Sequence, residues 1–131
     1  EPACLLMMDI DHFKQINDVY GHQAGDQALQ LFAALCRAVF RAGDVVGRWG
    51  GEEFLALLPA TRIEQAQAVA QRMHAALATR PLPGVEPPRV LTVSMGLSHF
   101  YPLRPLDQTL GTLDAALYTA KRDGRNRTVV V

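Results

Sequence analysis

The sequence predicts an α+β domain (α/β in the broad sense) in which helices flank a mixed, mostly antiparallel central sheet. Short apolar runs, which are typical of buried strands, alternate with longer segments whose apolar residues recur at helical spacing. Two apolar runs also surround the Gly50-Gly51 pair, and this indicates a β-hairpin because glycine adopts positive φ at little cost. A hairpin among strand–helix units implies a core of the ferredoxin-like or polymerase-palm type.

The length and composition are those of one globular domain. The 131 residues are enough for a hydrophobic core, so we treat 1–131 as a single domain. The formal net charge is zero, so the chain lacks the basic field that favours non-specific binding of nucleic acid, and we expect no nucleic-acid partner. Cys4 and Cys36 lie within apolar patterns, which favours buried thiols in a reducing, cytoplasmic compartment. Whether a longer parent protein is membrane-anchored stays open.

The first half of the chain predicts a strand and two helices before the hairpin. Residues 3–8 form an apolar run that is too short for a helix, which indicates a buried strand. Asp11 is expected to cap a short helix that stops at Gly21. Asp26 is expected to cap the long amphipathic helix that follows.

The second half predicts two more helices and two strands. Thr61 is expected to cap the next helix, with Glu64 three residues later completing a capping box. The segment 80–88 holds four prolines and a glycine, which indicates a loop. The remaining expected elements are a strand over 89–100, a helix that begins near Leu106 and ends at Gly124, and a strand over 128–131.

Carboxylates stand at the ends of two predicted strands. Asp9 follows the first strand and Glu52 lies at the tip of the hairpin, and in a palm-like sheet these strands are neighbours. Such carboxylates suit a hard divalent cation, to which the Ile10 carbonyl can add a ligand. Adjacent residues of a strand point to opposite faces, so Glu53 is expected to have a different role from Glu52.

Cationic residues occur near these acids in the predicted fold. Lys14 lies in the first turn of a predicted helix, where free N–H groups and the helix dipole attract phosphate. A second cationic group lies far along the chain, at Lys121, Arg122, Arg125 and Arg127. Each of these residues taken singly is better explained as a cap or a solvated charge. Together they predict a cleft for a phosphorylated ligand.

Four blocks of residues, in order along nearly the whole chain, are similar to those of GGDEF-family diguanylate cyclase domains. The late strand Val93–Gly96 matches the family as well. The four blocks are Met8–Asp18, then Tyr20–His22 with Gly25–Asp26, then Arg48–Phe54, and last Ala116–Lys121 with Gly124–Arg127. The third has glutamate in the variable place of the Gly-Gly motif. The resemblance implies a nucleotide-cyclase-like core and a diguanylate cyclase, which joins two GTP molecules into cyclic di-GMP and releases pyrophosphate.

The resemblance assigns the metal and the chemistry to the hairpin and the first strand. Asp9, the Ile10 carbonyl and Glu52 would hold Mg²⁺, with Mn²⁺ as an alternative. Glu53 would support the metal site or help remove the proton from the attacking hydroxyl. Lys14 would join Asp9 and the two glutamates as a catalytic residue.

The resemblance also assigns the contacts to GTP. Asn17 and Asp26 would read the guanine edge, and Gly50 and Gly51 would let the nucleotide lie against bare backbone. The triphosphate would be neutralised by cationic side chains and by backbone N–H groups at the helix start, at Phe13, Lys14, Lys121 and Arg125. Each domain would hold one GTP, so catalysis would need a homodimer.

The Arg41-x-x-Asp44 set, five residues before the Gly-Gly pair, matches the product-inhibition site of the family. Arg72 falls where the resemblance places a further arginine for cyclic di-GMP. Arginine grips phosphate or guanine edges bidentately, and aspartate accepts guanine N–H groups. The same pattern is also that of an ordinary turn with an ion pair.

Two other functions stay open at this stage. One is a non-catalytic sensor that binds GTP or cyclic di-GMP, and the other is an unrelated palm-like nucleotidyltransferase. The first stretch usual in the family, Asp-x-Leu-Thr-Gly-Leu-x-Asn-Arg-Arg, is absent from the sequence, so we expect a domain without its N-terminal segment. The parent protein is then expected to carry an N-terminal sensory or receiver domain.

Overall fold

A computed structural model describes all residues, 1–131, and contains five strands and four helices. Their order alternates single strands with helices around one hairpin, as the sequence predicts. The elements are β1 (Ala3–Ile10), α1 (Phe13–Tyr20), α2 (His22–Val39), β2 (Val45–Gly50), β3 (Glu53–Pro59), α3 (Ile63–Ala78), β4 (Val93–His99), α4 (Leu106–Arg122) and β5 (Arg127–Val130).

The five strands form one mixed sheet in the order β2-β3-β1-β4-β5. The central strand β1 pairs antiparallel with β3 and β4, and β2 pairs antiparallel with β3 in the hairpin. Only β5 runs parallel to its neighbour, β4. The predicted fold class, a mixed and mostly antiparallel sheet flanked by helices, is therefore confirmed.

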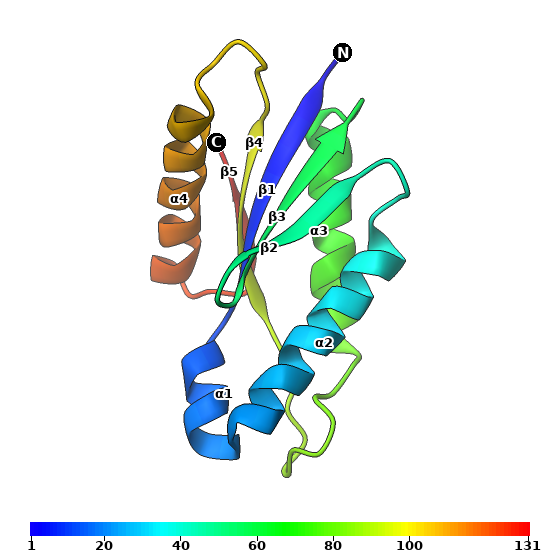
Figure 1. The fold of residues 1–131 in the computed structure, drawn as a ribbon, viewed down its shortest axis with the longest axis vertical. Coiled ribbons are helices and arrows are strands. Elements are labelled where there is room, and N and C mark those ends of the chain that lie inside the picture. Colours follow the sequence, from blue (N-terminus) through cyan, green and yellow to red (C-terminus); the bar gives the residue numbers. More distant parts are fainter.

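Helices cover both faces of this sheet (Figure 1). The even-numbered residues of β1, such as Leu6 and Met8, join the main core, which also takes in the buried sides of α2 and α3. The odd-numbered Leu5 and Met7 form a smaller cluster with Leu113 and Leu117 of α4 on the other face. β1 is therefore buried on both faces, which explains why its sequence is a continuous apolar run.

Several predicted helix starts differ from the structure. α2 begins at His22, so Asp26 lies within the helix and does not cap it. The residue before α1 is His12 in the left-handed conformation, with φ of 57°, and Asp11 does not cap that helix. α3 begins after Arg62, whose backbone N–H donates to the Gln65 side chain at 2.8 Å, so the predicted cap and capping box were both one residue early.

The predicted strands differ mainly in their ends. β1 continues to Ile10, so Asp9 is part of the strand and does not follow it. β4 covers only Val93–His99 of the predicted 89–100, because the preceding residues form a loop against α3. The hairpin turn is made by Gly51 and Glu52, with Gly50 paired opposite Glu53. Gly51 has φ of 44°, which a residue with a side chain rarely adopts.

A close approach between α4 and β4 depends on Gly96. A Cβ atom built there would lie 2.7 Å from the Leu113 backbone oxygen. Because that neighbour is backbone, α4 must move away, and we expect Gly96→Ala to lower the free energy of unfolding by about 1–3 kcal/mol. Gly47→Ala, in a strand glycine whose Cβ would meet nothing within 4 Å, is the matched control. Urea unfolding of the two variants measures the difference, and equal stability would contradict the tight packing.

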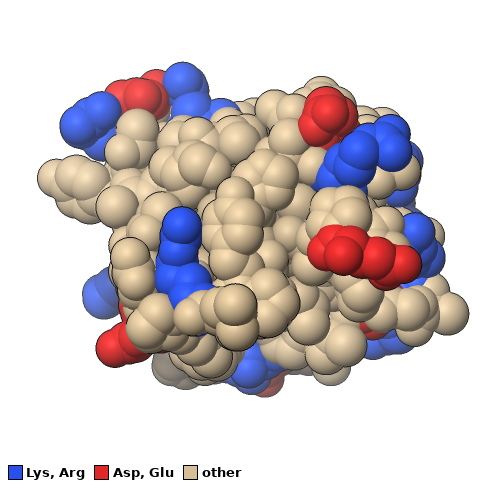
Figure 2. Space-filling view, turned by 90° about the horizontal axis from the view of Figure 1, so that it is seen from above, with Lys and Arg blue, Asp and Glu red and all other residues tan.

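Charged side chains of both signs are scattered over the face in Figure 2, singly or in small mixed groups on a largely uncharged surface. This distribution agrees with the formal net charge of zero. None of the four helices combines the length and apolar character required to cross a membrane.

Candidate active site

The predicted metal ligands meet at one end of the central strand. Ile10 donates its backbone N–H to the carbonyl oxygen of Glu52 at 3.2 Å, which fastens the hairpin turn to the end of β1. Asp9 is paired across the sheet with Glu53, so these two side chains share one face. In Figure 1 the β2–β3 turn lies close to the end of β1 and to the C-terminal end of α4.

Lys121, in the last turn of α4, reaches across to this cluster. Its Nζ atom lies 2.6 Å from Oδ2 of Asp9, although the two residues are 112 positions apart. Burial raises the pKa of the Asp9 carboxyl, an effect that Lys121 opposes and Glu52 reinforces. Burial also raises the pKa of Glu53, and the neighbouring Asp9 raises it further. The site therefore brings together more negative charge than one lysine offsets.

The donor set fits a divalent metal ion. Asp9, Glu52 and the Ile10 carbonyl offer the hard oxygen ligands that Mg²⁺ and Mn²⁺ prefer, and an added cation would relieve the repulsion among the carboxylates. No three His, Cys, Asp or Glu side chains converge into a complete metal cage. Mg²⁺ ordinarily takes only one or two carboxylates from the protein and the rest of its ligands from phosphates and water.

Lys14 and Arg125 lie on two segments that flank this cluster. Lys14 is in the first turn of α1, a few residues after β1, and its side chain is 89% exposed with an ion pair to Asp18 at 2.9 Å. Arg125 follows α4, and its guanidinium makes no hydrogen bond or ion pair within the protein. The other arginines of this second cationic group are already bound, Arg122 to Asp123 and Arg127 to the Arg125 carbonyl.

The two predicted guanine readers lie on the paired helices α1 and α2. Asn17 of α1 packs over Gly25 of α2 so closely that a Cβ atom at Gly25 would lie 1.9 Å from its Oδ1 atom. Asp26 is the next residue and is exposed. The Asn17 amide nitrogen makes only one long contact, 3.5 Å to the Phe13 carbonyl. The bare backbone at Gly25 thus leaves room for the Asn17 side chain, one residue before Asp26.

The three predicted product-inhibition residues line one pocket. Arg41, Asp44 and Arg72 surround a cavity of about 280 Å³ between the turn before β2 and helix α3. Arg41 is already engaged there: it binds Asp44 at 3.3 Å and the hydroxyl of Thr61 at 2.6 Å, and also contacts the Pro59 carbonyl. In the free protein Arg41 and Asp44 therefore form an ion-paired turn, the alternative that the sequence left open. The Arg72 side chain makes no hydrogen bond or ion pair.

The sequence did not reveal the role of Asp11. Its side chain is buried and accepts hydrogen bonds from Thr92 and Ser94, both at 2.7 Å, and from the backbone N–H of Asn126 at 3.0 Å. An aspartate directly after a strand is equally typical of a helix cap, so no local signal distinguishes the two. The distinction depends on partners that are 81 to 115 positions away.

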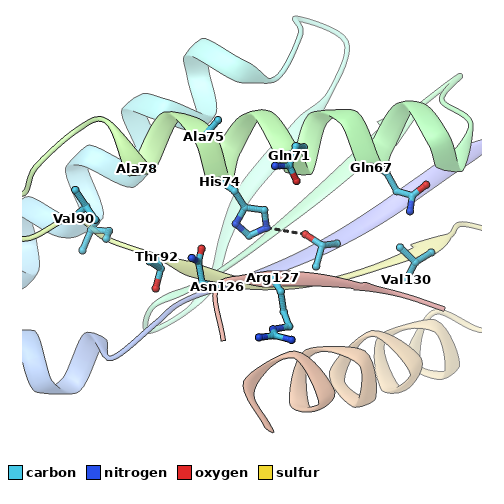
Figure 3. A pocket seen from close by; sticks show the side chains of 12 residues that line it. Gln67, Gln71, His74, Ala75, Ala78, Val90, Thr92, Asn126, Arg127 and Val130 are labelled. Carbon is cyan, nitrogen blue, oxygen red and sulfur yellow. Dashed lines mark hydrogen bonds between the residues drawn. The ribbon is translucent and has the colours of Figure 1, made fainter. Parts of the chain in front are cut away.

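A groove of about 630 Å³ lies between α3 and β5 (Figure 3). Its polar lining includes Gln67 and Gln71 of α3 and Asn126 and Thr128 at the start of β5. Across it, Nε2 of His74 lies 2.9 Å from the Thr128 hydroxyl, the contact dashed in Figure 3. None of the predicted nucleotide-binding residues lines this groove.

A palm-like sheet that gathers carboxylates and a lysine at the end of its central strand defines a domain of the class that acts on nucleotide phosphates. Within that class, the chain belongs to the GGDEF family: residues 1–127 match the family model described as diguanylate cyclase, GGDEF domain. This bears out the resemblance seen in the four blocks of residues.

Characterised relatives and solved structures agree with this membership. The chain is 44% identical over 123 residues to diguanylate cyclase DgcM of Escherichia coli and 42% identical over 123 residues to diguanylate cyclase DgcP of Pseudomonas aeruginosa. Each match covers 94% of this chain but only 29% and 18% of those proteins. The chain thus spans less than a third of the length of these relatives.

Among solved structures, diguanylate cyclase SiaD of Pseudomonas aeruginosa, in complex with its activator SiaC, superposes with a TM-score of 0.93 and 38% identity over 99% of this chain and 50% of that one. The GGDEF domain of DgcB from Caulobacter crescentus, in complex with c-di-GMP, superposes with a TM-score of 0.91 and 32% identity, over 98% of this chain and 77% of that one. The active GGEEF domain of a Vibrio cholerae diguanylate cyclase superposes with a TM-score of 0.90 and 34% identity, over 99% of this chain and 83% of that one. Residues 50–54 here read Gly-Gly-Glu-Glu-Phe, the pattern that names this last domain.

Proposed function

We propose that this domain condenses two GTP molecules into cyclic di-GMP, releases pyrophosphate and depends on Mg²⁺ or Mn²⁺. The observation that carries the proposal is the placement of Asp9, Glu52 and Glu53 at one end of β1, with Lys121 bound to Asp9. No acid or glycine of the hairpin motif is missing, and the related proteins are named diguanylate cyclases.

The chemistry is a transfer in which the 3′-hydroxyl of one GTP attacks the α-phosphate of the other. Asp9, the Ile10 carbonyl and Glu52 would hold the metal, which when bound would lower the pKa of the attacking hydroxyl and neutralise charge on the phosphates. Glu53 lies opposite Asp9 and has a raised pKa, so it is placed to support the metal ligands or to accept the hydroxyl proton. Bond formation to this α-phosphate expels one pyrophosphate, and the reciprocal attack by the second 3′-hydroxyl closes the ring and expels another.

The remaining residues bind and orient GTP. Lys14, Lys121 and the unpaired Arg125 neutralise the triphosphate, and the free N–H groups at the start of α1, near Phe13 and Lys14, add hydrogen bonds. Asn17 and Asp26 read the guanine edge, Asp26 by accepting from the ring N–H and the amino group. The side-chain-free Gly50 and Gly51 leave room for the nucleotide beside the hairpin.

Assembly follows from this chemistry. Each domain holds one GTP, so two copies must face each other, and we propose a homodimer as the catalytic form. In the parent protein an N-terminal sensory or receiver domain would control that pairing, because tethering raises the effective concentration to roughly the millimolar range. Because the proposed substrate, GTP, is a cytoplasmic nucleotide, we also propose that the domain lies in the cytoplasm.

Incubation of the purified full-length protein with GTP and Mg²⁺, followed by identification of the products, tests the proposal. We expect cyclic di-GMP and pyrophosphate, and a rate that rises more than linearly with protein concentration wherever the dimer is incompletely formed. Binding of GTP or cyclic di-GMP without turnover would instead indicate the non-catalytic sensor. Equal turnover of ATP would overturn the assignment of the guanine readers.

We further propose that the pocket formed by Arg41, Asp44 and Arg72 binds cyclic di-GMP and inhibits the enzyme. The pocket is lined by two arginines and an aspartate, residue types that bind phosphate and guanine edges. Arg72 is free there, whereas Arg41 and Asp44 bind each other and the Asp44 side chain is only 2% exposed, so cyclic di-GMP would have to replace that ion pair. Arg41 also joins the turn before β2 to the start of α3. Removing Arg41 therefore changes the fold locally as well as the pocket.

Arg72→Ala is the cleaner test of this pocket, because Arg72 makes no hydrogen bond in the structure. We expect it to weaken the binding of cyclic di-GMP about tenfold or more, as expected for losing a charged hydrogen bond, with unfolding unchanged. Arg41→Ala is expected to weaken binding and also to lower stability. Arg80→Ala, which removes an exposed arginine beyond the end of α3, is the control. Calorimetry that finds the same product affinity in Arg72→Ala and Arg80→Ala would refute this site.

A further inference from the structure

We propose that Asp11 is a positioning residue for the nucleotide site, acting through the segment Asp123–Arg127, which we term the cation loop. Asp11 holds this loop at the end of β1 and so fixes the place of Arg125. The inference rests on the proposed function, because it concerns how the chain organises its phosphate-binding side chains. Asp11 itself is not proposed to touch GTP or metal.

Asp11 is a buried carboxylate that no cation neutralises. Only 4% of the residue is exposed, and it forms no ion pair. Its oxygens are satisfied by three donors from two separate segments: the hydroxyls of Thr92 and Ser94, before and within β4, and the backbone N–H of Asn126 in the cation loop. Burying a charge without a counter-ion is costly, so these bonds must be short and well aligned to retain it.

The cation loop has a backbone that needs such support. Gly124, Arg125 and Asn126 are consecutive and all have positive φ, of 121°, 63° and 50°. For residues with side chains this conformation is strained and persists only where surrounding contacts hold it. The bond from Asn126 to Asp11 is therefore a restraint on the conformation of Arg125, the residue that precedes it.

Other contacts restrain the loop at its two ends. Arg125 donates its own N–H to the Ala120 carbonyl at 2.9 Å, and Arg127 binds the Arg125 carbonyl at 3.0 Å. Just beyond the loop, Thr128 is fixed by His74 from α3, as Figure 3 shows. Asp11 supplies the one bond from this loop to the end of β1, the strand that also carries Asp9.

The consequence for the site is that one strand end organises two members of the second cationic group, Lys121 and Arg125. Asp9 binds the Lys121 ammonium, and Asp11, two residues later, holds the loop that carries Arg125. Without Asp11 the strained loop can relax, and Arg125 must be reordered each time a triphosphate binds. Holding a group in place in advance lowers that cost, which is how a residue away from the ligand affects binding.

The test measures the affinity of the full-length protein for a GTP analogue with a methylene group between its α- and β-phosphates. We expect Asp11→Ala to weaken binding about tenfold, the effect of losing a hydrogen bond that holds a charged group. In an Arg125→Ala background, Asp11→Ala should weaken binding of the analogue little further, because the group that Asp11 positions is already absent. Losses that multiply fully in the double variant would overturn the proposal.

Two further variants separate positioning from charge and from folding. Asp11→Asn can keep all three bonds if its carboxamide oxygen faces Thr92 and Asn126 and its NH₂ group donates to Ser94, so it should restore most of the affinity. Ser94→Ala removes one donor to Asp11 and should weaken binding about threefold. Ser98→Ala is the matched control, since Ser98 is a buried β4 serine that bonds only the His99 carbonyl.

If Asp11→Ala does not fold, the comparison of Ser94→Ala with Ser98→Ala still decides. Equal affinity in these two variants, or a loss in Asp11→Asn as large as in Asp11→Ala, would overturn the inference. Wild-type protein that binds the analogue but makes no cyclic di-GMP from GTP would refute the proposed function. The binding comparison for Asp11 would remain valid in that case.

Discussion

Replacing Glu52 with glutamine is expected to lower the rate of cyclic di-GMP formation at least about a hundredfold, the range for removing one well-placed electrostatic group. The substitution keeps the size of the side chain and removes its charge. Glu52 lies in the hairpin turn, and its backbone is bonded to Ile10, so the fold does not depend on its carboxylate. The loss should therefore appear in turnover and in the dependence on metal concentration.

The control for Glu52→Gln is Glu86→Gln, which makes the same chemical change in an exposed loop. Steady-state turnover over a range of Mg²⁺ concentrations, together with thermal unfolding of each variant, separates catalysis from stability. Near-wild-type turnover of Glu52→Gln would exclude Glu52 as a metal ligand. A matching loss in Glu86→Gln would show that the effect is not specific to the site.

Gly25→Ala is expected to lower the affinity for GTP at least about tenfold and to reduce its preference over ATP. A Cβ atom at this position would lie 1.9 Å from Oδ1 of Asn17, so the Asn17 side chain must leave its place over residue 25. A site built to hydrogen-bond its substrate loses much of its discrimination when one of those groups is displaced. Titrations with GTP and ATP measure both quantities.

The matched control for Gly25→Ala is Gly111→Ala, another substitution of a glycine within a helix. A Cβ atom at Gly111 meets nothing within 4 Å, so nucleotide binding should not change, and the helix should gain slightly in stability. Asp26→Ser tests the second guanine reader directly and should weaken the preference for GTP over ATP. If Gly25→Ala and Asp26→Ser both kept the wild-type ratio of GTP to ATP affinity, the guanine site would lie elsewhere.

The periodicity of the sequence was sufficient for the types and order of the elements. β1 is buried on both faces and therefore appears as an unbroken apolar run, and α2 presents one apolar stripe to the core. Both features are local, because burial on a given face determines the apolar spacing within each element. The ends of elements were less certain, since a cap depends on a few polar contacts: the predicted cap at Thr61 binds Arg41 instead.

The blocks of similar residues likewise identified the family, and they contain Asp9, Glu52 and Asp26, the acids expected at the site. The similarity of these blocks did not determine which partner each acid binds. Asp9 and Asp11 are two residues apart and chemically identical, yet one binds Lys121 and the other binds the cation loop.

The sequence by itself thus determined the fold class, the family and the residue types at the site. Only the tertiary structure decided which carboxylate lies beside a cation, that Arg41 is already engaged, and that Asn17 rests on the bare backbone of Gly25. The physical reason is distance along the chain. Hydrogen bonds such as those from Lys121 to Asp9 and from Asn126 to Asp11 join residues 112 and 115 positions apart, and no local pattern encodes such a partner.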